Sequence, residues 1–318
     1  MHPITKLVAQ RLGIGLLLLL AVSVLIFAGT EMLPGDVAQA ILGQSATPVA
    51  LANLREQMGL NDPAHVRYFH WLVGILHGDL GTALTNGANI RSEIADRLGN
   101  TLFLAFWAAI VAVPLAITLG LLAVRYRNRW PDRLISGVTL ATISLPEFVA
   151  GYILMYLFAV KFRLFSPIST LRPGMALGEE LYAIALPVAV LVLVVLAHMM
   201  RMTRAAILNV MQSAYIETAE LKGLRPFAII ARHAFPNAVA PVVNVVMLNL
   251  AYLVVGVVVV EVVFVYPGMG QYLVDHVAKR DIPVVQACGL IFAAVYIGLN
   301  ILADVISILA NPRLRHPK

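Results

Sequence analysis

The sequence of 318 residues contains little charge and a single cysteine. Lys, Arg, Asp and Glu together make up 13% of it, about half of the share that is usual in soluble domains. A disulfide within the chain is excluded, because Cys288 has no second cysteine to pair with. Hydrophobic residues reach 60% and the mean hydropathy is +0.85. This composition predicts an integral membrane protein.

The motifs of common catalytic and nucleotide-binding sites are absent as well. The sequence has no Gly-Lys dipeptide and therefore no phosphate-binding P-loop, no His-Glu-x-x-His, no Gly-x-Ser-x-Gly and no Cys/His cluster with metal-ligand spacing. A soft-metal site is conceivable at His198, Met199, Met200 and Met202, but side-chain packing explains this group better. We therefore expect no enzymatic activity, no catalytic residue, and no cofactor or metal in this chain.

Six apolar runs are long enough to cross a membrane as helices. They cover residues 12–28, 101–124, 134–160, 181–200, 239–265 and 284–309. The third run is interrupted by Ser144-Leu145-Pro146-Glu147. The first could be a cleaved signal peptide, but the nearest Ala-x-Ala pattern, at residues 38–40, lies too far beyond it for a usual cleavage site. We predict an all-α integral membrane protein with six transmembrane helices in one domain, residues 1–318.

The basic residues indicate the orientation of these helices. With six spans, both termini lie on one side, and that side also carries loop 125–133 and an insert at residues 201–238. It holds 14 of the 23 Lys and Arg residues, so the positive-inside rule places both termini and the insert in the cytoplasm. The net charge of +6 is explained by short loops beside membrane lipid, and we expect no binding to nucleic acid.

Residues 31–100 differ from the apolar runs in composition. They contain seven acidic residues and four arginines. Residues 51–58 and 64–76 are typical of short amphipathic helices, and Gly78-Asp79-Leu80-Gly81 is typical of a turn. A bare loop of this length is unusual in a compact protein. We therefore expect an ordered cap on the extracytoplasmic side.

The insert at residues 201–238 predicts two helices. Ser213 can cap the first, and Gly223 suits a left-handed stop. Pro226 would start the second helix and Pro236 would close it. The residues that would share one face of the first helix are Tyr215, Thr218, Ala219 and Lys222. A helix of about two turns is marginal alone, so it either docks in a groove of a soluble partner or packs under its own bundle as a hairpin.

Short motifs occur along the whole chain, from about residue 10 to residue 315. One is Glu217-Thr218-Ala219-x3-Gly223-x9-His233-x-Phe235-Pro236. The others are Gly59-Leu60-Asn61-Asp62-Pro63, Gly78-Asp79-Leu80-Gly81, Ser144-x-Pro146, Arg201-x-Thr203-Arg204, Glu261-x-x-Phe264-x-x-Pro267-Gly268-x-Gly270, Asp281-x-Pro283-Val284-Val285-Gln286 and Asn311-Pro312-Arg313-Leu314-Arg315. The first resembles the EAA loop of ABC importer permeases. Together they resemble the dipeptide/oligopeptide/nickel-type permease family.

This resemblance implies the type I ABC importer permease fold and a place in the bacterial inner membrane. The chain would form the translocation path of an ATP-driven importer for a peptide or peptide-like solute. Its partners would be a second, usually different permease, two ABC ATPase subunits that bind ATP and Mg, and a periplasmic or lipid-anchored substrate-binding protein. The insert would be the coupling helix, and the residues expected at the ATPase are Tyr215, Glu217, Thr218, Ala219, Lys222 and Gly223.

The translocation path or its gate is expected at polar residues in or near the spans, namely Ser144, Glu147, Asn244 and Glu261. A carboxylate in hydrocarbon costs at least about 2.5 kcal/mol, so it should face the bundle or a wet cavity. Glu147, where the family has a neutral residue, either contacts a cationic part of the cargo or pairs with a neighbouring permease. Glu261 would organise an outer gate or a subunit interface. An ion-coupled secondary transporter without an ATPase is the alternative, although the internal symmetry typical of that class is not visible.

Overall fold

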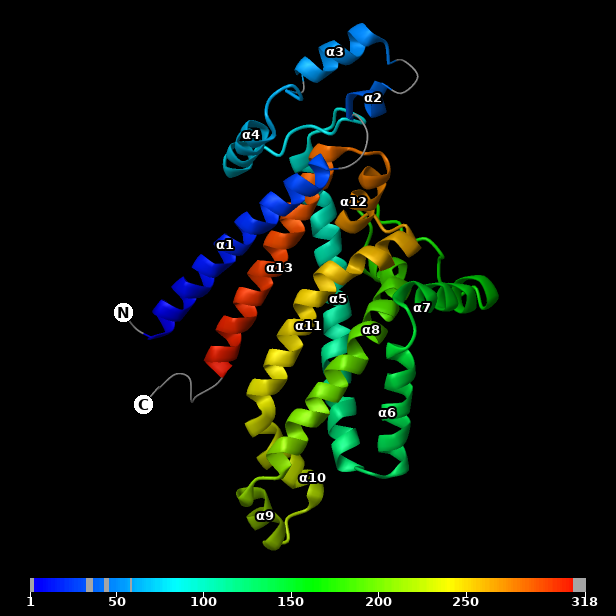
Figure 1. Cartoon of the computed structure of the whole chain (residues 1–318). Helices are drawn as coiled ribbons and strands as arrows, with labels where there is room; N and C mark the ends of the chain where they lie inside the picture. The colour runs from blue at the N-terminus through cyan, green and yellow to red at the C-terminus, as the bar shows by residue number, and fades with distance from the viewer. Residues whose placement is uncertain (1–2, 33–36, 43–45, 58, 311–318) are drawn as a thin grey trace.

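The computed structural model describes residues 3–32, 37–42, 46–57 and 59–310. It is built almost entirely of helices, as predicted, and the single β pairing in its described part is an isolated bridge between Thr82 and Asn89. Five long helices form the bundle in Figure 1: α1 (Pro3–Glu31), α5 (Ile90–Arg125), α8 (Leu177–Met211), α11 (Phe235–Phe264) and α13 (Ile282–Ala310). Each contains a stretch long and apolar enough to cross a membrane. The all-α membrane fold is thereby confirmed.

The centre of the bundle is the contact between α5 and α8. The side of α5 that packs into the core carries small residues: Ala108, Ala112 and Ala116 are at most 1% exposed. One turn further, a Cβ added to Gly120 would lie 3.0 Å from Cγ2 of Thr203 on α8. Small side chains let two helix backbones approach closely. Close packing of this kind drives helix association in membranes, because lipid is as apolar as the helices and no hydrophobic effect drives them together. The row of alanines thus allows α5 to pack closely on the core helices.

The third predicted span differs from a straight helix. It consists of α6 (Trp130–Ile143), α7 (Glu147–Leu154) and the π-helical segment η2 (Met155–Lys161), and the two halves are bent by 105°. Ser144 ends α6, and Pro146 precedes α7, where it has no N–H to continue the helix. The break was expected at these residues, but the size of the bend was not. Figure 1 shows α7 projecting sideways from the bundle.

A second bend follows α11. The helix ends at Phe264, and α12 (Met269–Ala278) continues at 78° to the last part of α11. Val265 at this corner has φ 52°. The Tyr266 N–H donates to the Glu261 carbonyl over 2.8 Å, and the Val265 N–H donates to the Val262 carbonyl over 3.3 Å. This is the left-handed helix stop that usually requires glycine, here occupied by a β-branched residue.

Three short helices lie at one end of the bundle and correspond to the predicted cap. They are α2 (Val37–Leu42), α3 (Pro48–Gln57) and α4 (Ala64–Leu76). Residues 33–36, 43–45 and 58, which belong to the predicted cap, lie outside the described residues. The predicted turn is present, with φ of +78° at Gly78 and +80° at Gly81 and a 2.9 Å hydrogen bond from the Gly81 N–H to Asp79 Oδ1.

The segment after this turn is fixed to the bundle by one buried carboxylate. Asp281, between α12 and α13, accepts hydrogen bonds at Oδ2 from the N–H and the hydroxyl of Thr85, both over 3.0 Å. Because Asp281 is fully buried, this contact joins residues that are far apart in sequence without exposure to solvent. The Asn89 side chain then caps α5 by accepting from the N–H groups of Arg91 and Ser92.

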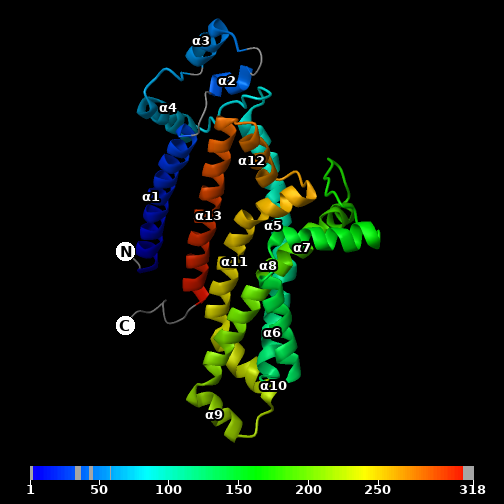
Figure 2. The same ribbon diagram turned by 45° about the vertical axis from the view of Figure 1, so that its right-hand side comes forward.

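The molecule has two distinct ends in Figures 1 and 2. The cap helices lie at one end, and the short helix α9 (Ala214–Leu221) lies at the other. The first residues of α1 and the last of α13 point toward the end that carries α9. Residues 311–318, which contain the last motif of the sequence, lie outside the described residues.

Candidate functional site

The helix predicted in the insert is α9, and its two ends differ in how well they are capped. Ser213 occupies the N-cap position, but its side chain makes no capping hydrogen bond, contrary to the prediction. Its carbonyl accepts from the Ile216 N–H over 2.9 Å instead. At the other end Gly223 has φ +75°, as predicted. The Gly223 N–H bonds the Glu220 carbonyl, and the next N–H bonds the Ala219 carbonyl, which completes a Schellman stop.

The inner face of α9 packs on its own bundle. Ile216 is 1% exposed and Ala219 is 6% exposed. They belong to a buried apolar cluster with residues of α8, η3 (Ile229–Ala234) and α11, among them Ile207, Ile229, Ile230 and Ala234. The prediction that Ala219 shares an exposed face with Tyr215, Thr218 and Lys222 is therefore wrong. The small side chain is required because Ala219 is pressed against the bundle.

The outer face of α9 carries the remaining predicted contact residues. Tyr215, Glu217, Thr218, Lys222 and Gly223 are all exposed. Sequence reasoning missed two exposed apolar residues, Leu221 at 83% and Phe227 at 70%, both more exposed than Tyr215 at 44%. Leu221 lies five positions after the buried Ile216, hence about 140° around the helix from it. That spacing was the available signal that Leu221 points outward.

The second helix of the insert begins at Pro226, as predicted, with the short α10 (Pro226–Ala228). It does not end at Pro236. The chain passes through the π-helical segment η3 directly into α11, whose first turn contains Pro236. A proline is tolerated in a first helical turn, and the wide π turn before it absorbs the missing hydrogen bond. The insert is therefore continuous with α11.

The opposite end of the bundle contains a second polar site, centred on Glu261. This carboxylate is fully buried between α5, α11 and α12. It accepts three hydrogen bonds: from Thr101 Oγ1 over 2.7 Å, from the Gly270 N–H over 2.7 Å and from the Gln271 N–H over 3.0 Å. The last two donors belong to the first turn of α12, whose N–H groups have no partner within that helix. Glu261 thus caps α12 and does not line an open path within this chain.

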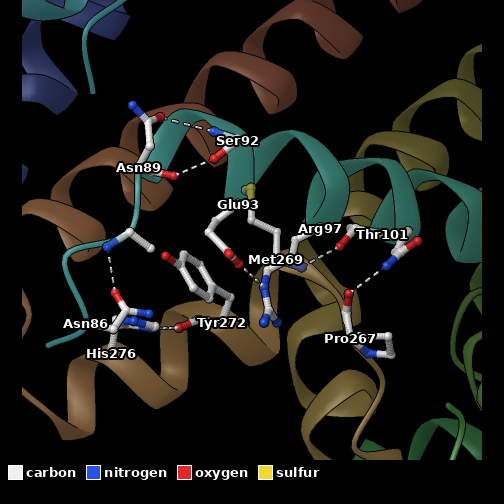
Figure 3. A network of polar contacts seen from close by, with 12 residues as sticks. Asn86, Asn89, Ser92, Glu93, Arg97, Thr101, Pro267, Met269, Tyr272 and His276 are labelled. Carbon is white, nitrogen blue, oxygen red and sulfur yellow. Dashed lines mark hydrogen bonds and ion pairs between the residues drawn. The ribbon is translucent and has the colours of Figure 1, made fainter. Parts of the chain in front are cut away.

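Further hydrogen bonds fix α5 to the same corner (Figure 3). Thr101 Oγ1 accepts from the Met269 N–H over 2.9 Å, so one hydroxyl serves two helices. The Asn100 side chain donates to the Pro267 carbonyl over 2.8 Å. The Asn100 backbone carbonyl accepts from the Tyr266 hydroxyl over 2.8 Å. The corner that follows α11 is therefore held by the buried contacts of Glu261 and Thr101 and by the half-buried contacts of Asn100. Such satisfied networks specify one arrangement of the packed helices.

A cation packs beside this network. The Arg97 guanidinium lies 4.6 Å from the centre of the Tyr272 ring and 3.6 Å from a carboxylate oxygen of Glu93. The Tyr272 ring in turn lies 4.2 Å from the His276 ring. Figure 3 shows these side chains between α5 and α12. They extend the contact of the two helices toward the cap.

The other predicted path residues lie on a different part of the surface. Glu147, half-buried at the start of α7, accepts a 2.9 Å hydrogen bond from the Tyr252 hydroxyl on α11. Tyr252 is 48% exposed and was not predicted from the sequence. Ser144 is exposed and donates to the Leu140 carbonyl over 3.0 Å, and Asn244 is exposed on α11. Glu147 and Tyr252 are brought together, whereas Glu261 belongs to the network described above.

A buried ion pair near the insert was also missed. The Arg204 guanidinium on α8 donates to both carboxylate oxygens of Asp132 on α6, over 3.0 and 2.9 Å. Asp132 also accepts from the Asn128 N–H over 2.9 Å and is 4% exposed. The bidentate contact ties the base of α6 to the helix that leads into α9. Arg204 was visible in the sequence as part of the motif Arg201-x-Thr203-Arg204. The motif did not indicate that Asp132 is its acidic partner.

Only part of the His/Met group contributes to packing, because His198 and Met202 are exposed. His198 Nδ1 lies 3.3 Å from the Asn249 side-chain oxygen, while Met199 and Met200 are fully buried in the core. Asn249 also donates to the Val245 carbonyl over 2.8 Å. Polar contacts of this kind join helices within a membrane.

Two family models match the chain. Residues 97–316 match "Binding-protein-dependent transport system inner membrane component", and residues 4–105 match "Binding-prot-dependent transport system membrane comp, N-term". The glutathione transport system permease protein GsiC of Salmonella typhimurium is 37% identical over 306 residues, which covers 94% of this chain and 95% of that protein. The probable peptide ABC transporter permease protein y4tP of Sinorhizobium fredii is 32% identical over 309 residues, 97% of this chain and 99% of that protein.

A solved structure of the MetNI methionine ABC transporter, in an inward facing conformation, contains a chain that aligns with 69% of this one and over 95% of its own length. The TM-score is 0.48 and the sequence identity is 16%. Similarity at this level decides nothing about fold or function.

Proposed function

The chain belongs to the family of binding-protein-dependent transport system inner membrane components, and we propose that its cargo is a peptide or a peptide-like solute such as glutathione. It is a multi-pass permease subunit of an ATP-driven importer in the inner membrane and not an enzyme. This membership argues against the ion-coupled secondary transporter. The names of the relatives support the cargo, since both glutathione and peptides present a free amino group, a carboxylate and an amide backbone.

The α9 end of the molecule is the side on which the ATPase subunits dock. The observation that carries this assignment is the division of α9 into two faces. Ile216 and Ala219 hold it to the bundle, while Leu221, Tyr215 and Lys222 remain exposed. A helix of two turns that offers one aromatic and one aliphatic side chain suits a groove on a soluble partner. Force applied to it is transmitted to α8 and α11, because the buried cluster joins all three.

The roles of the predicted contact residues follow from these two faces. Tyr215, Glu217, Thr218 and Lys222 contact the ATPase, together with Leu221 and Phe227. Ala219 lies on the buried face by which α9 packs on its own bundle. Gly223 sets the left-handed turn that ends the helix, and thereby the direction of the exposed segment after it. ATP and Mg bind to the partner subunits.

The cap end faces outward, and both termini face the cytoplasm. The excess of Lys and Arg on the side of α9 supports this orientation. A substrate-binding protein then delivers its cargo near α2, α3 and α4. A second permease, different from this chain, completes the membrane part, and two ATPase subunits complete the importer.

The translocation path lies against the surface that carries Glu147, Tyr252, Ser144 and Asn244. These polar groups are exposed or half-buried in segments predicted to lie in the membrane. A charged carboxylate facing lipid costs at least about 2.5 kcal/mol, so this surface is covered by the second permease or by the water of the path. Glu147 would meet the amino group of the cargo. Glu261 acts on the path indirectly, because it holds the corner between α11 and α12.

Purification from native membranes in mild detergent tests this function. We expect a second permease, ATPase subunits and a binding protein to accompany the chain, and mass spectrometry of the ligand on the binding protein identifies the cargo. Reconstituted with these partners, the importer should take up glutathione or a tripeptide only when ATP is supplied on the side of the ATPases. Uptake driven by an ion gradient and indifferent to ATP would contradict the proposal.

A further inference from the structure

The cap helix α4 (Ala64–Leu76) has an apolar face that no part of the described chain covers. None of its residues is buried. Phe69 is 60% exposed, Val73 50% and Leu76 77%, and Leu72 beside them is half-buried. The four occur at i, i+3, i+4 and i+7 spacing and therefore form one stripe along the helix. An exposed stripe of this kind requires an apolar cover.

The neighbouring face of α4 packs on the end of α1. The Phe27 ring lies 5.4 Å from the Tyr68 ring and 6.0 Å from the Trp71 ring. The Tyr68 hydroxyl lies 2.9 Å from the Ser23 hydroxyl. At about 100° per residue, the stripe and this face form one apolar arc on the helical wheel, interrupted only in the first turn by the exposed His65. The side chain of Arg67, which pairs with Glu31, lies on the remaining arc.

The remaining arc of α4 is polar. At about 100° per residue, Arg67, His70 and His77 fall on it together with Gly74. His70 and His77 are exposed. The helix is thus amphipathic. One part of its apolar arc packs on α1, the other part is the uncovered stripe, and the polar arc lies opposite. Such a helix lies in the plane of a membrane surface when it is placed at the right depth.

The depth of α4 follows from α1. The membrane-crossing stretch of α1 is Val8–Glu31, with 24 residues, about 36 Å at the rise of an α-helix. The hydrocarbon core is about 30 Å thick, so Phe27 and Glu31 at the end of this stretch reach the interfacial zone. Figure 2 shows α4 lying across that end of α1. Trp and Tyr side chains are enriched at this depth, which agrees with Trp71 and Tyr68.

An apolar groove connects α4 with the exposed surface of α1. Its volume is about 320 Å³, and it is lined by Val24, Phe27, Ala28, Met32, Ala64 and Tyr68, with Glu31 and His65 as its two ionisable residues. Beyond it α1 exposes a continuous apolar surface that includes Leu25 at 70% and Leu17 at 67%. This edge lies on the opposite side of the bundle from α7 in both views (Figures 1 and 2). The edge formed by α1 and α4 is thus remote from the polar surface at Glu147, which we propose is covered by the second permease or by water.

We propose that α4 is an interfacial membrane helix whose stripe Phe69-Leu72-Val73-Leu76 is immersed in the acyl chains of phospholipids at the capped side. The polar arc faces water and lipid headgroups, and the groove admits part of an acyl chain. The cap is thereby held at a fixed height above the bundle by lipid as well as by α1. This inference requires that α1 crosses the membrane and is independent of the cargo.

Spin labels on α4 test this inference in the assembled importer reconstituted in phosphatidylcholine vesicles. Phe69→Cys and Leu76→Cys place a label on the stripe, and His70→Cys and His77→Cys place matched labels on the polar arc. All four are made with Cys288→Ala, which removes the native thiol. Collisions with oxygen, which concentrates in lipid, are compared with collisions with a water-soluble nickel chelate. ATP-dependent uptake by each variant shows that the importer is intact.

The expected result is a positive logarithm of the oxygen-to-nickel collision ratio at both stripe sites and a negative one at both histidine sites. Two outcomes overturn the inference. Frequent nickel collisions at the stripe mean that it faces water. Low collision rates with both reagents at the stripe mean that a protein covers it, such as the second permease or the binding protein.

Discussion

Thr101 on α5 and Glu261 on α11 are 160 residues apart in sequence and are joined by a 2.7 Å hydrogen bond between Oγ1 and Oε1. The same carboxylate accepts from the first-turn N–H groups of α12, which has no side-chain cap of its own. One buried group therefore fixes the relative positions of three helices. A conformational change at the capped end must either move this corner as a unit or break it.

Gly268→Ala should break the corner. A Cβ at Gly268 would lie 2.1 Å from Glu261 Oε1, so the carboxylate must leave its donors. Overpacking costs about 1–3 kcal/mol, and thermal unfolding of the detergent-solubilised protein should report the loss. Gly137→Ala is the matched control, because a Cβ there meets nothing within 4 Å.

The source of that loss can be isolated with a double variant. Glu261→Ala removes the carboxylate that the added Cβ would strike. If the clash is the cause, Gly268→Ala should add little destabilisation to Glu261→Ala, since the effects of contacting residues are not additive. Additive losses would show that Gly268 matters for another reason.

Val265→Gly should stabilise the protein. Val265 has φ 52° and its side chain is 54% exposed, so the substitution removes strain of about 1–3 kcal/mol and little packing. Part of this gain is offset by the freedom of glycine in the unfolded chain. We expect a higher unfolding temperature than that of the parent. Val259→Gly, in the interior of α11, should lower the unfolding temperature, because glycine disfavours a helix interior. A fall for both variants would contradict the strain at Val265.

The structure explains why some of these features could be predicted from the sequence and others could not. The positions of the apolar helices, the break at Pro146 and the left-handed turn at Gly223 depend on neighbouring residues, so local patterns were sufficient. The helix lengths were underestimated, because α1, α5 and α8 extend beyond the apolar runs at 12–28, 101–124 and 181–200. The partners of Glu261 and Asp132 lie on other helices, and no local pattern names them. Ala219 was misplaced because spacing defines a face without saying which face is buried. Pro236 was misread because the π turn before it has no sequence signature.

Arg204→Ala should be much more harmful than Arg201→Ala. Removing Arg204 leaves the buried Asp132 carboxylate without its cation, which costs about 3–5 kcal/mol. Arg201 is exposed on the same helix, so its loss should change stability by less than about 0.5 kcal/mol. Thermal unfolding of both variants provides the comparison. Equal effects would mean that the ion pair does not hold α6 to α8.

Glu147→Gln should separate the charge of Glu147 from its hydrogen bond. The amide oxygen can still accept from Tyr252, whereas the negative charge is lost. If Glu147 meets the amino group of the cargo, uptake of a tripeptide with a free amino group should fall about tenfold, equivalent to about 1.4 kcal/mol. Tyr252→Phe keeps the charge and should have a smaller effect. Unchanged uptake after Glu147→Lys would exclude contact with the cargo.

The docking of α9 on an ATPase subunit is tested most directly by photo-crosslinking in the assembled importer. A benzoylphenylalanine residue is introduced at Leu221, which is 83% exposed on α9, or at Leu76, which is 77% exposed at the capped end. Irradiation should join this chain to an ATPase subunit from position 221 and not from position 76. An ATPase adduct from position 76, or none from position 221 in a complex that still contains the ATPases, would contradict the coupling role of α9.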